Sequence, residues 1–135
     1  MAQVNLQINQ AAVRALLIDP SGGVARDLKR RGENVASLAK KYAPVNTGRL
    51  RASINARLVS YGGGIAVLVG TNVNYAMYQH EGTGIYGPHG TPIVPRNAKF
   101  LRFVPKGGST YVFARSVKGS PPTFFLRRAL VAAAR

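Results

Sequence analysis

The spacing of apolar positions changes along the chain and predicts a series of short elements. Val4, Leu6 and Ile8 alternate with polar residues, and this period of two predicts a short strand at the start. Residues 11–18 follow as a short helix, which the breaker Asp19-Pro20-Ser21-Gly22-Gly23 closes. A longer helix is predicted over residues 24–42, before Pro44. Its apolar residues recur at helical spacing: Val24, Leu28, Val35, Leu38, Ala39 and Tyr42.

Two hairpins are predicted in the middle of the chain. Residues 54–61 and 65–71 are rich in Val, Ile and Leu, and three consecutive glycines join them. Residues 100–105 and 110–117 form the second pair of strands, around a Lys-Gly-Gly-Ser turn. Between the hairpins, residues 75–81 are predicted to form a helical turn.

A last helix is predicted from Ser120-Pro121-Pro122 onward, with Ser120 as its cap and Pro121 at its first position. Helical spacing places Leu126, Ala129, Leu130 and Ala133 on its buried face. We expect Leu38 and Leu130 to be buried against the sheet. These elements predict an α+β fold in which a long N-terminal helix and a C-terminal helix pack on a small, mostly antiparallel sheet of two hairpins.

The length of 135 residues favours a single domain over residues 1–135, large enough to bury roughly two thirds of its unfolded surface. Within it, residues 1–23 form an arm of strand and short helix, and residues 82–98 form a long exposed loop rich in Gly and Pro. Loops of this length inside a small domain are usually functional or disordered. We expect this one to be mobile in the free subunit and to become ordered against neighbours. The candidate assembly residues in it are Gly82, Gly84, Tyr86, His89 and Arg96.

The net charge of +15 arises more from missing acids than from abundant bases, because only 4 Asp and Glu accompany 19 Lys and Arg. All four acids lie in the first 81 residues. Such a balance favours nucleic acid or acidic protein partners, and the alternative is a solubilising charge with no partner. With no cysteine, thiolate chemistry and disulfides are excluded. The sequence shows no apolar run long enough to span a membrane and no signal peptide.

Candidate catalytic and cofactor motifs are weak. Residues 82–87 match the letters of a dinucleotide-binding G-x-G-x-x-G, but Pro88 and Gly90 exclude the helix that must follow, and no acid follows Glu81. Gly48-Arg49 lacks the Lys-Ser/Thr ending of a phosphate-binding loop, so Thr47 fits better as a cap or turn residue. We therefore expect no cofactor, no metal site and no enzymatic activity.

His80-Glu81 is the only adjacent acid–base pair, and it leaves a small basic ribonuclease as one alternative. The simpler interpretation is a histidine packed on tyrosines or bonded to the backbone. A second alternative is a basic nucleic-acid-binding module, in which tyrosines stack on bases between Arg and Lys. Tyrosines near strand ends are more often part of the rim of the core. These tyrosines are Tyr75, Tyr78, Tyr86 and Tyr111.

Three sequence segments resemble a known family. They are "KKYAPVNTGRLRASI" after the long helix, "VGTNVNYAMYQHEGTG" after the first hairpin, and the terminal "GSPPTFFLRRAL". In this order they resemble the head–tail connector, or tail-completion, proteins of long-tailed bacteriophages, over about residues 24–131. The histidine before Glu81-Gly82 and the break at residues 19–23 depart from the usual family pattern.

The resemblance implies a structural virion protein of the neck, with helices on a small, mostly antiparallel sheet. It implies a ring that joins tail to head and lets the genome pass, with six or twelve copies, of which six is favoured by analogy with six-fold tail tubes. The implied partners are other copies of the chain, head-closure and tail-terminator or tail-tube proteins, and DNA contacted without sequence preference, but no membrane. The implied location is the virion, and the host cytoplasm during assembly. The candidate contacts to DNA or to neighbours are Arg49, Arg51 and Arg57.

Overall fold

In the computed structural model, which describes residues 3–135, the longest element is α2 (Gly23–Tyr42), the helix predicted over residues 24–42. Its fully buried positions hold only small residues: Ala25, Gly32, Ala36 and Ala39. The larger Val35, Leu38 and Tyr42 are half-buried at the rim of the core, so the prediction of a buried Leu38 is only partly correct. Small side chains let the α2 backbone approach its neighbours closely.

The first hairpin forms as predicted. β1 (Asn55–Tyr61) pairs antiparallel with β2 (Gly64–Gly70), with Asn55 opposite Gly70 and Tyr61 opposite Gly64. The two residues between the strands, Gly62 and Gly63, have φ of 56° and 76°, which a two-residue turn matching the strand twist requires. One face of the hairpin packs on α2, where a Cβ at Gly32 would overlap Val67.

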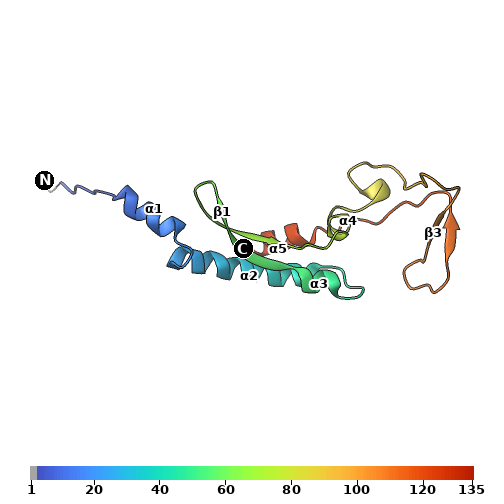
Figure 1. The fold of residues 1–135 in the computed structure, drawn as a ribbon, viewed down its shortest axis with the longest axis horizontal. Helices are drawn as coiled ribbons and strands as arrows, with labels where there is room; N and C mark the ends of the chain where they lie inside the picture. Colours follow the sequence, from blue (N-terminus) through green and yellow to red (C-terminus); the bar gives the residue numbers. More distant parts are fainter. Residues whose placement is uncertain (1–2) are drawn as a thin grey trace.

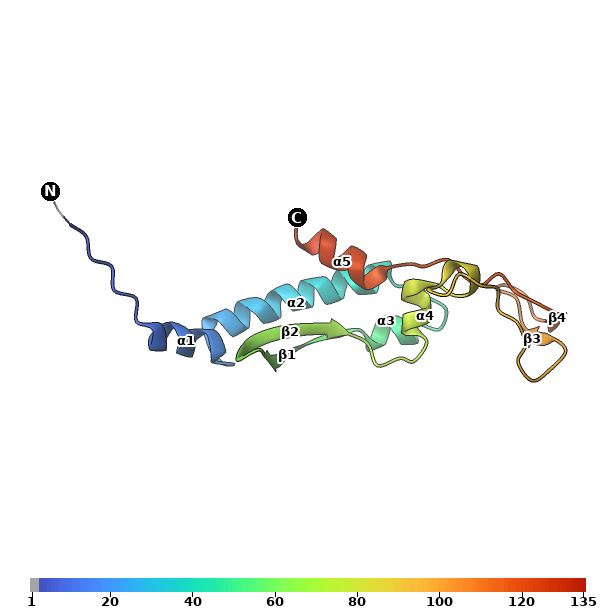
Figure 2. The same ribbon diagram turned by 90° about the horizontal axis from the view of Figure 1, so that it is seen from above.

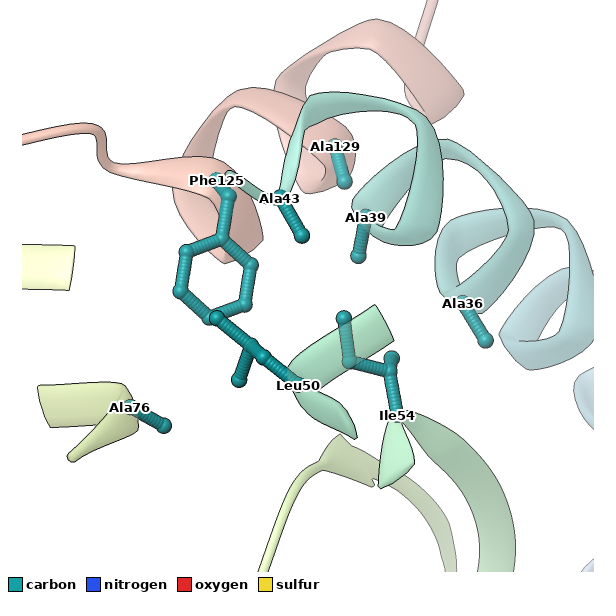
Figure 3. Packing of buried hydrophobic residues seen from close by; sticks show 8 residues of the cluster. All are labelled: Ala36, Ala39, Ala43, Leu50, Ile54, Ala76, Phe125 and Ala129. Carbon is teal, nitrogen blue, oxygen red and sulfur yellow. The ribbon is translucent and has the colours of Figure 1, made fainter. Parts of the chain in front are cut away.

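The core lies where four helices meet the base of this hairpin (Figure 3). The helices that contribute are α2, the short α3 (Arg49–Ser53), α4 (Ala76–Glu81) and α5 (Phe125–Ala133), and α5 lies beside α2. The only large side chains that are fully buried there are Phe125 and Ile54. The buried cluster is Ala36, Ala39, Ala43, Leu50, Ile54, Ala76, Phe125 and Ala129.

The last helix begins at Phe125, so the predicted start at Ser120, with Ser120 as its cap, is wrong. The N–H groups of Thr123 and Phe124 donate instead to the carbonyls of Gln79 and His80, at 3.1 and 3.0 Å. Those carbonyls belong to α4, and bonding to them holds residues 123–124 outside a helix. Phe124 then turns the chain with a left-handed φ of 47°.

The predicted buried face of α5 is confirmed in part, because Ala129 is buried and Leu126 packs against the core. Phe125 and Ala129 are completely buried, while Leu130 is 61% exposed. The prediction of a buried Leu130 is therefore wrong, because α5 meets α2 through the row that Phe125 and Ala129 define.

At one end of the molecule, α1 (Gln10–Ile18) forms as predicted, and the Asn9 side chain accepts a hydrogen bond from the N–H of Ala12. The strand predicted over Val4, Leu6 and Ile8 does not form. Residues 3–9 extend away from the rest of the chain (Figure 2) and pair with no strand of the described part. A strand needs a partner for its backbone groups, and alternation of side chains does not supply one.

At the other end, residues 84–86 form a 3-10 turn (Gly84–Tyr86), and the second hairpin is shorter than predicted: β3 (Leu101–Phe103) pairs with β4 (Val112–Ala114). It lies well away from the first hairpin (Figure 1), and the two form separate two-stranded sheets. The α+β architecture of two helices with two antiparallel hairpins is confirmed.

The chain exposes more surface than its size predicts. Its accessible area is 10803 Å², whereas a compact monomer of 14.4 kDa exposes about 6,800 Å². About half of the unfolded surface is buried, and not the roughly two thirds expected from the length. The length alone therefore overestimates the core, because both ends of the chain extend beyond it (Figure 1).

Candidate basic and assembly surfaces

The three arginines predicted to contact DNA or a neighbour lie on consecutive elements. Arg49 and Arg51 are on α3, which follows the left-handed Gly48, and Arg57 is on β1. All three side chains are exposed. Arg57 alternates with Ala56, which faces Gly32 of α2, so Arg57 lies on the opposite face of the hairpin. Thr47 does not cap α3, whose capping position is Gly48.

Few of the cations are neutralised within residues 3–135. Ion pairs join only Asp27 to Arg30 and Arg31, at 2.7 and 2.8 Å. Hydrogen bonds from these two guanidinium groups, Arg30 first, lower the pKa of Asp27 below its ordinary value. The Ser21 N–H and hydroxyl likewise lower the pKa of Asp19. Two of the 4 acids are thus engaged locally, and 17 of the 19 Lys and Arg side chains form no ion pair within this range.

The loop over residues 82–98 begins with a close backbone junction. The N–H groups of Thr83 and Ile85 donate to the carbonyls of Ser120 and Lys118 at 2.9 and 2.8 Å. A Cβ at Gly82 would lie 2.9 Å from the Ser120 carbonyl oxygen, and one at Gly84 would overlap the Lys118 carbonyl. Both glycines also have a left-handed φ. They are therefore needed for close approach of two chain segments, which the sequence pattern alone did not reveal.

Beyond the junction, residues of the loop and of α4 line an open cleft of about 540 Å³. Gly82, Gly84, His89 and Arg96 line this cleft together with Met77 and Tyr78 of α4. Tyr86, the fifth candidate assembly residue, is exposed but is not among the lining residues. The structure thus brings four of the five candidates to one place.

His80 has a packing role in this structure. Its ring lies edge-on to the rings of Phe124 and Phe125, at 5.5 and 5.4 Å between centroids. Its Nε2 atom is buried, with no hydrogen-bond partner in the described part of the chain. The neighbours are phenylalanines of the C-terminal segment and not the tyrosines expected from the sequence. Residues 3–135 bring together no group of three or more His, Asp or Glu side chains that could hold a metal ion.

The second hairpin carries guanidinium groups stacked on aromatic rings. Tyr111 was named from the sequence as a possible stacking residue, but these pairs were not predicted. The Arg102 guanidinium lies 3.8 Å from the centre of the Tyr111 ring, and that of Arg115 lies 5.9 Å from Phe100. Phe113 is exposed beside them. The signal in the sequence was the mixture of aromatic and basic residues over positions 100–115.

Within the described range, no helix has both the length and the apolar character needed to cross a membrane.

Comparison with known protein families gives a match to part of the chain. Residues 23–82 match the family model HK97-gp10_like, described as "Bacteriophage HK97-gp10, putative tail-component". No curated protein and no solved structure matches the chain. The matched segment runs from the start of α2 to the residue after α4, and so includes the α3 arginines, the first hairpin and Gly82. It is shorter than the resemblance over residues 24–131. Over residues 23–82, somewhat less than half of its length, the chain is similar to the HK97-gp10-like family of bacteriophage tail components.

Proposed function

We propose that the protein is a subunit of the phage neck, where several copies form a ring that joins the tail to the head and through which the genome passes. The observation that carries this proposal is the large exposed surface. The subunit exposes about 4,000 Å² more than a compact protein of its mass. Much of the excess lies on the two extended ends (Figures 1 and 2), which are suited to reach adjacent molecules.

Large apolar side chains on these ends support an assembly role. At the N-terminal end, Val4, Leu6 and Ile8 are exposed, and at the other end Tyr111 and Phe113 are exposed. Apolar surface on this scale in a folded subunit marks contact sites for other proteins. We assign the cleft residues Gly82, Gly84, His89 and Arg96, with Tyr86 beside them, to contacts with a neighbouring copy or with head-closure and tail-terminator or tail-tube proteins.

The charge supports passage of DNA. A ring of identical subunits of net charge +15 repels itself unless phosphates or acidic neighbours offset the charge. Arg49, Arg51 and Arg57 are exposed cations of the family-matched segment, and we assign them to the lumen. A conduit requires contacts to phosphate and not to base edges, so that DNA can slide.

Electron microscopic reconstruction of the neck of the intact particle tests the proposal. We expect a closed ring of this chain between head and tail tube, with α3 and β1 toward the DNA and residues 82–96 against an adjacent protein. Finding the chain elsewhere in the particle, or without rotational symmetry, would exclude a neck ring. Finding α3 and β1 on the outside would exclude only the assignment of the three arginines.

A further inference from the structure

The N-terminal end presents an apolar surface that the chain itself does not cover. Val4, Leu6 and Ile8 alternate along residues 3–9 and are 90, 81 and 60% exposed. The following helix, α1, has no buried residue, and Leu16 and Leu17 are among its exposed side chains. From here on, the name arm is used for residues 3–18 only, the part of the predicted segment 1–23 that ends with α1.

The arm differs from the rest of the chain in charge. Arg14 is its only charged residue, whereas the protein as a whole carries 19 basic side chains. Two copies of this protein repel each other over most of their surface. The arm can therefore contact another copy with little charge repulsion. An acidic protein or a nucleic acid would make few favourable charge contacts with the arm, because Arg14 is its only cation.

The same chain also carries a surface that the arm fits. The sheet of β1 and β2 has two strands, so each strand has one edge without a partner among residues 3–135. An unpaired edge binds a further extended segment through backbone hydrogen bonds. Residues 3–9 span about 23 Å when extended, and β1 and β2 are each 7 residues long, which span about the same length. The exposed Tyr61 and Leu68 of this sheet offer apolar contacts to such a strand.

We propose that the arm docks on the neighbouring copy, with residues 3–9 adding a strand to one of the two free edges of its β1–β2 sheet. α1 lies beside the turn of its own hairpin, but residues 3–9 extend away from the sheet (Figure 2), so the acceptor for these residues is a second molecule. This completes the strand that the alternation of Val4, Leu6 and Ile8 predicts. This proposal rests on the proposed ring, and it specifies a contact between two subunits of that ring.

The test is the association state of the full chain by sedimentation equilibrium at low and high salt. Raising the salt from about 0.1 M to about 1 M shortens the screening length from about 10 Å to about 3 Å. Repulsion between copies then fades while apolar contacts strengthen, so we expect the protein to associate at high salt.

Two variants with the same change in charge identify the surface. In one, Val4, Leu6 and Ile8 are changed to Asp. In the control, Asn5, Gln7 and Asn9 on the opposite side of the same segment are changed to Asp. Asp also caps helices, so α1 keeps its cap. All six side chains are exposed, and neither variant disturbs the core. We expect the first variant to remain monomeric at high salt and the control to associate like the unchanged protein.

A second measurement identifies the acceptor, using the absence of native cysteine. Molecules with Leu6→Cys are mixed with molecules carrying Ser60→Cys in β1 or Leu68→Cys in β2. A short thiol cross-linker should give mixed dimers with at least one of these acceptors, and far fewer with the control Ser37→Cys on α2.

Three results would overturn the proposal: no association of the unchanged protein at high salt, equal association of both variants, or cross-linking no better than with the control. None of them bears on whether the particle has a neck ring. Conversely, a particle without the ring would leave the arm contact standing as a property of the protein in solution.

Discussion

Alanine and glycine, not leucine, form the contact surface of α2. The helix meets β1, β2 and α5 through Ala25, Gly32, Ala36 and Ala39, and its larger apolar side chains lie at the edge of the contact. The large buried side chains of the core come instead from other elements and are Phe125, Ile54 and Leu50. A small core of this kind concentrates stability in few side chains, because each of them is surrounded by atoms that cannot easily move to fill a gap.

Replacing Phe125 with Ala should lower the free energy of unfolding by about 3–5 kcal/mol. The removed ring is fully buried against α2, α3 and α4, and its loss leaves a cavity. Leu130→Ala on the same helix is the control and should change stability by less than about 0.5 kcal/mol, because that side chain is exposed. Urea unfolding followed by circular dichroism measures both. Similar losses for the two variants would show that α5 packs through a different face.

At the scale of elements, the close approach of α2 to the hairpin depends on Gly32. Glycine in the interior of a helix costs about 1 kcal/mol relative to alanine. It is favoured here because a Cβ would overlap Val67 Cγ1 and lie 3.3 Å from Ala56. Valine is stiff at χ1 and cannot turn away without cost. The same reasoning applies at the junction of Gly84 with Lys118, where a backbone carbonyl occupies the space of a Cβ.

Gly32→Ala should therefore destabilise the protein by about 1–3 kcal/mol, although alanine is the better helix former. Gly23→Ala is the matched control, since a Cβ there has no atom within 4 Å. It should be neutral or stabilising by up to about 1 kcal/mol. Thermal unfolding of the two variants gives the sign of each change. A stabilising effect at position 32 would mean that helix and hairpin are further apart than described.

At the scale of the whole molecule, the charge and the exposed area point to different partners. Cations without ion partners are suited to phosphate or acidic proteins, whereas the exposed apolar ends are suited to protein contacts. Added salt has opposite effects on these two kinds of contact. It weakens binding to phosphate, but it favours association between copies because it reduces their mutual repulsion. The response to salt therefore separates the two kinds of contact in one protein.

If the chain is a passive conduit, binding to duplex DNA should be weak, independent of sequence and steeply reduced by salt. Changing Arg49, Arg51 and Arg57 to Gln should reduce the slope of log affinity against log salt by about one unit for each lost phosphate contact. The control changes Arg26, Lys29 and Lys41 on the exposed side of α2 to Gln and should have a smaller effect. Filter binding of several unrelated duplexes measures both.

Two other results, one from the same titration and one from an RNA-cleavage assay, would favour the alternatives. A preference of about a thousandfold for one sequence is the range of a specific DNA-binding module and would exclude the passive conduit. Cleavage of an RNA substrate that is lost in His80→Ala would favour the ribonuclease. His80 is packed between two phenylalanine rings, so His80→Phe should keep the packing while removing any proton transfer.

The local sequence was sufficient to predict α1, α2, α4, both hairpins and the glycine turn between β1 and β2. Apolar spacing and glycine at positions with a left-handed φ act over a few neighbouring residues, so no distant contact is needed to produce these elements. The excess of basic charge is likewise a property of the sequence alone. Tertiary structure decided the rest. The start of α5 depends on hydrogen bonds between residues 123–124 and α4, which are far apart in sequence. The buried face of α5, the need for glycine at positions 32, 82 and 84, and the separation of the two hairpins depend on which segments meet. The physical reason is clearest in the N-terminal segment, where Val4, Leu6 and Ile8 alternate with polar residues. A periodic pattern determines which side chains share a face, but only a packing partner determines whether that face is buried.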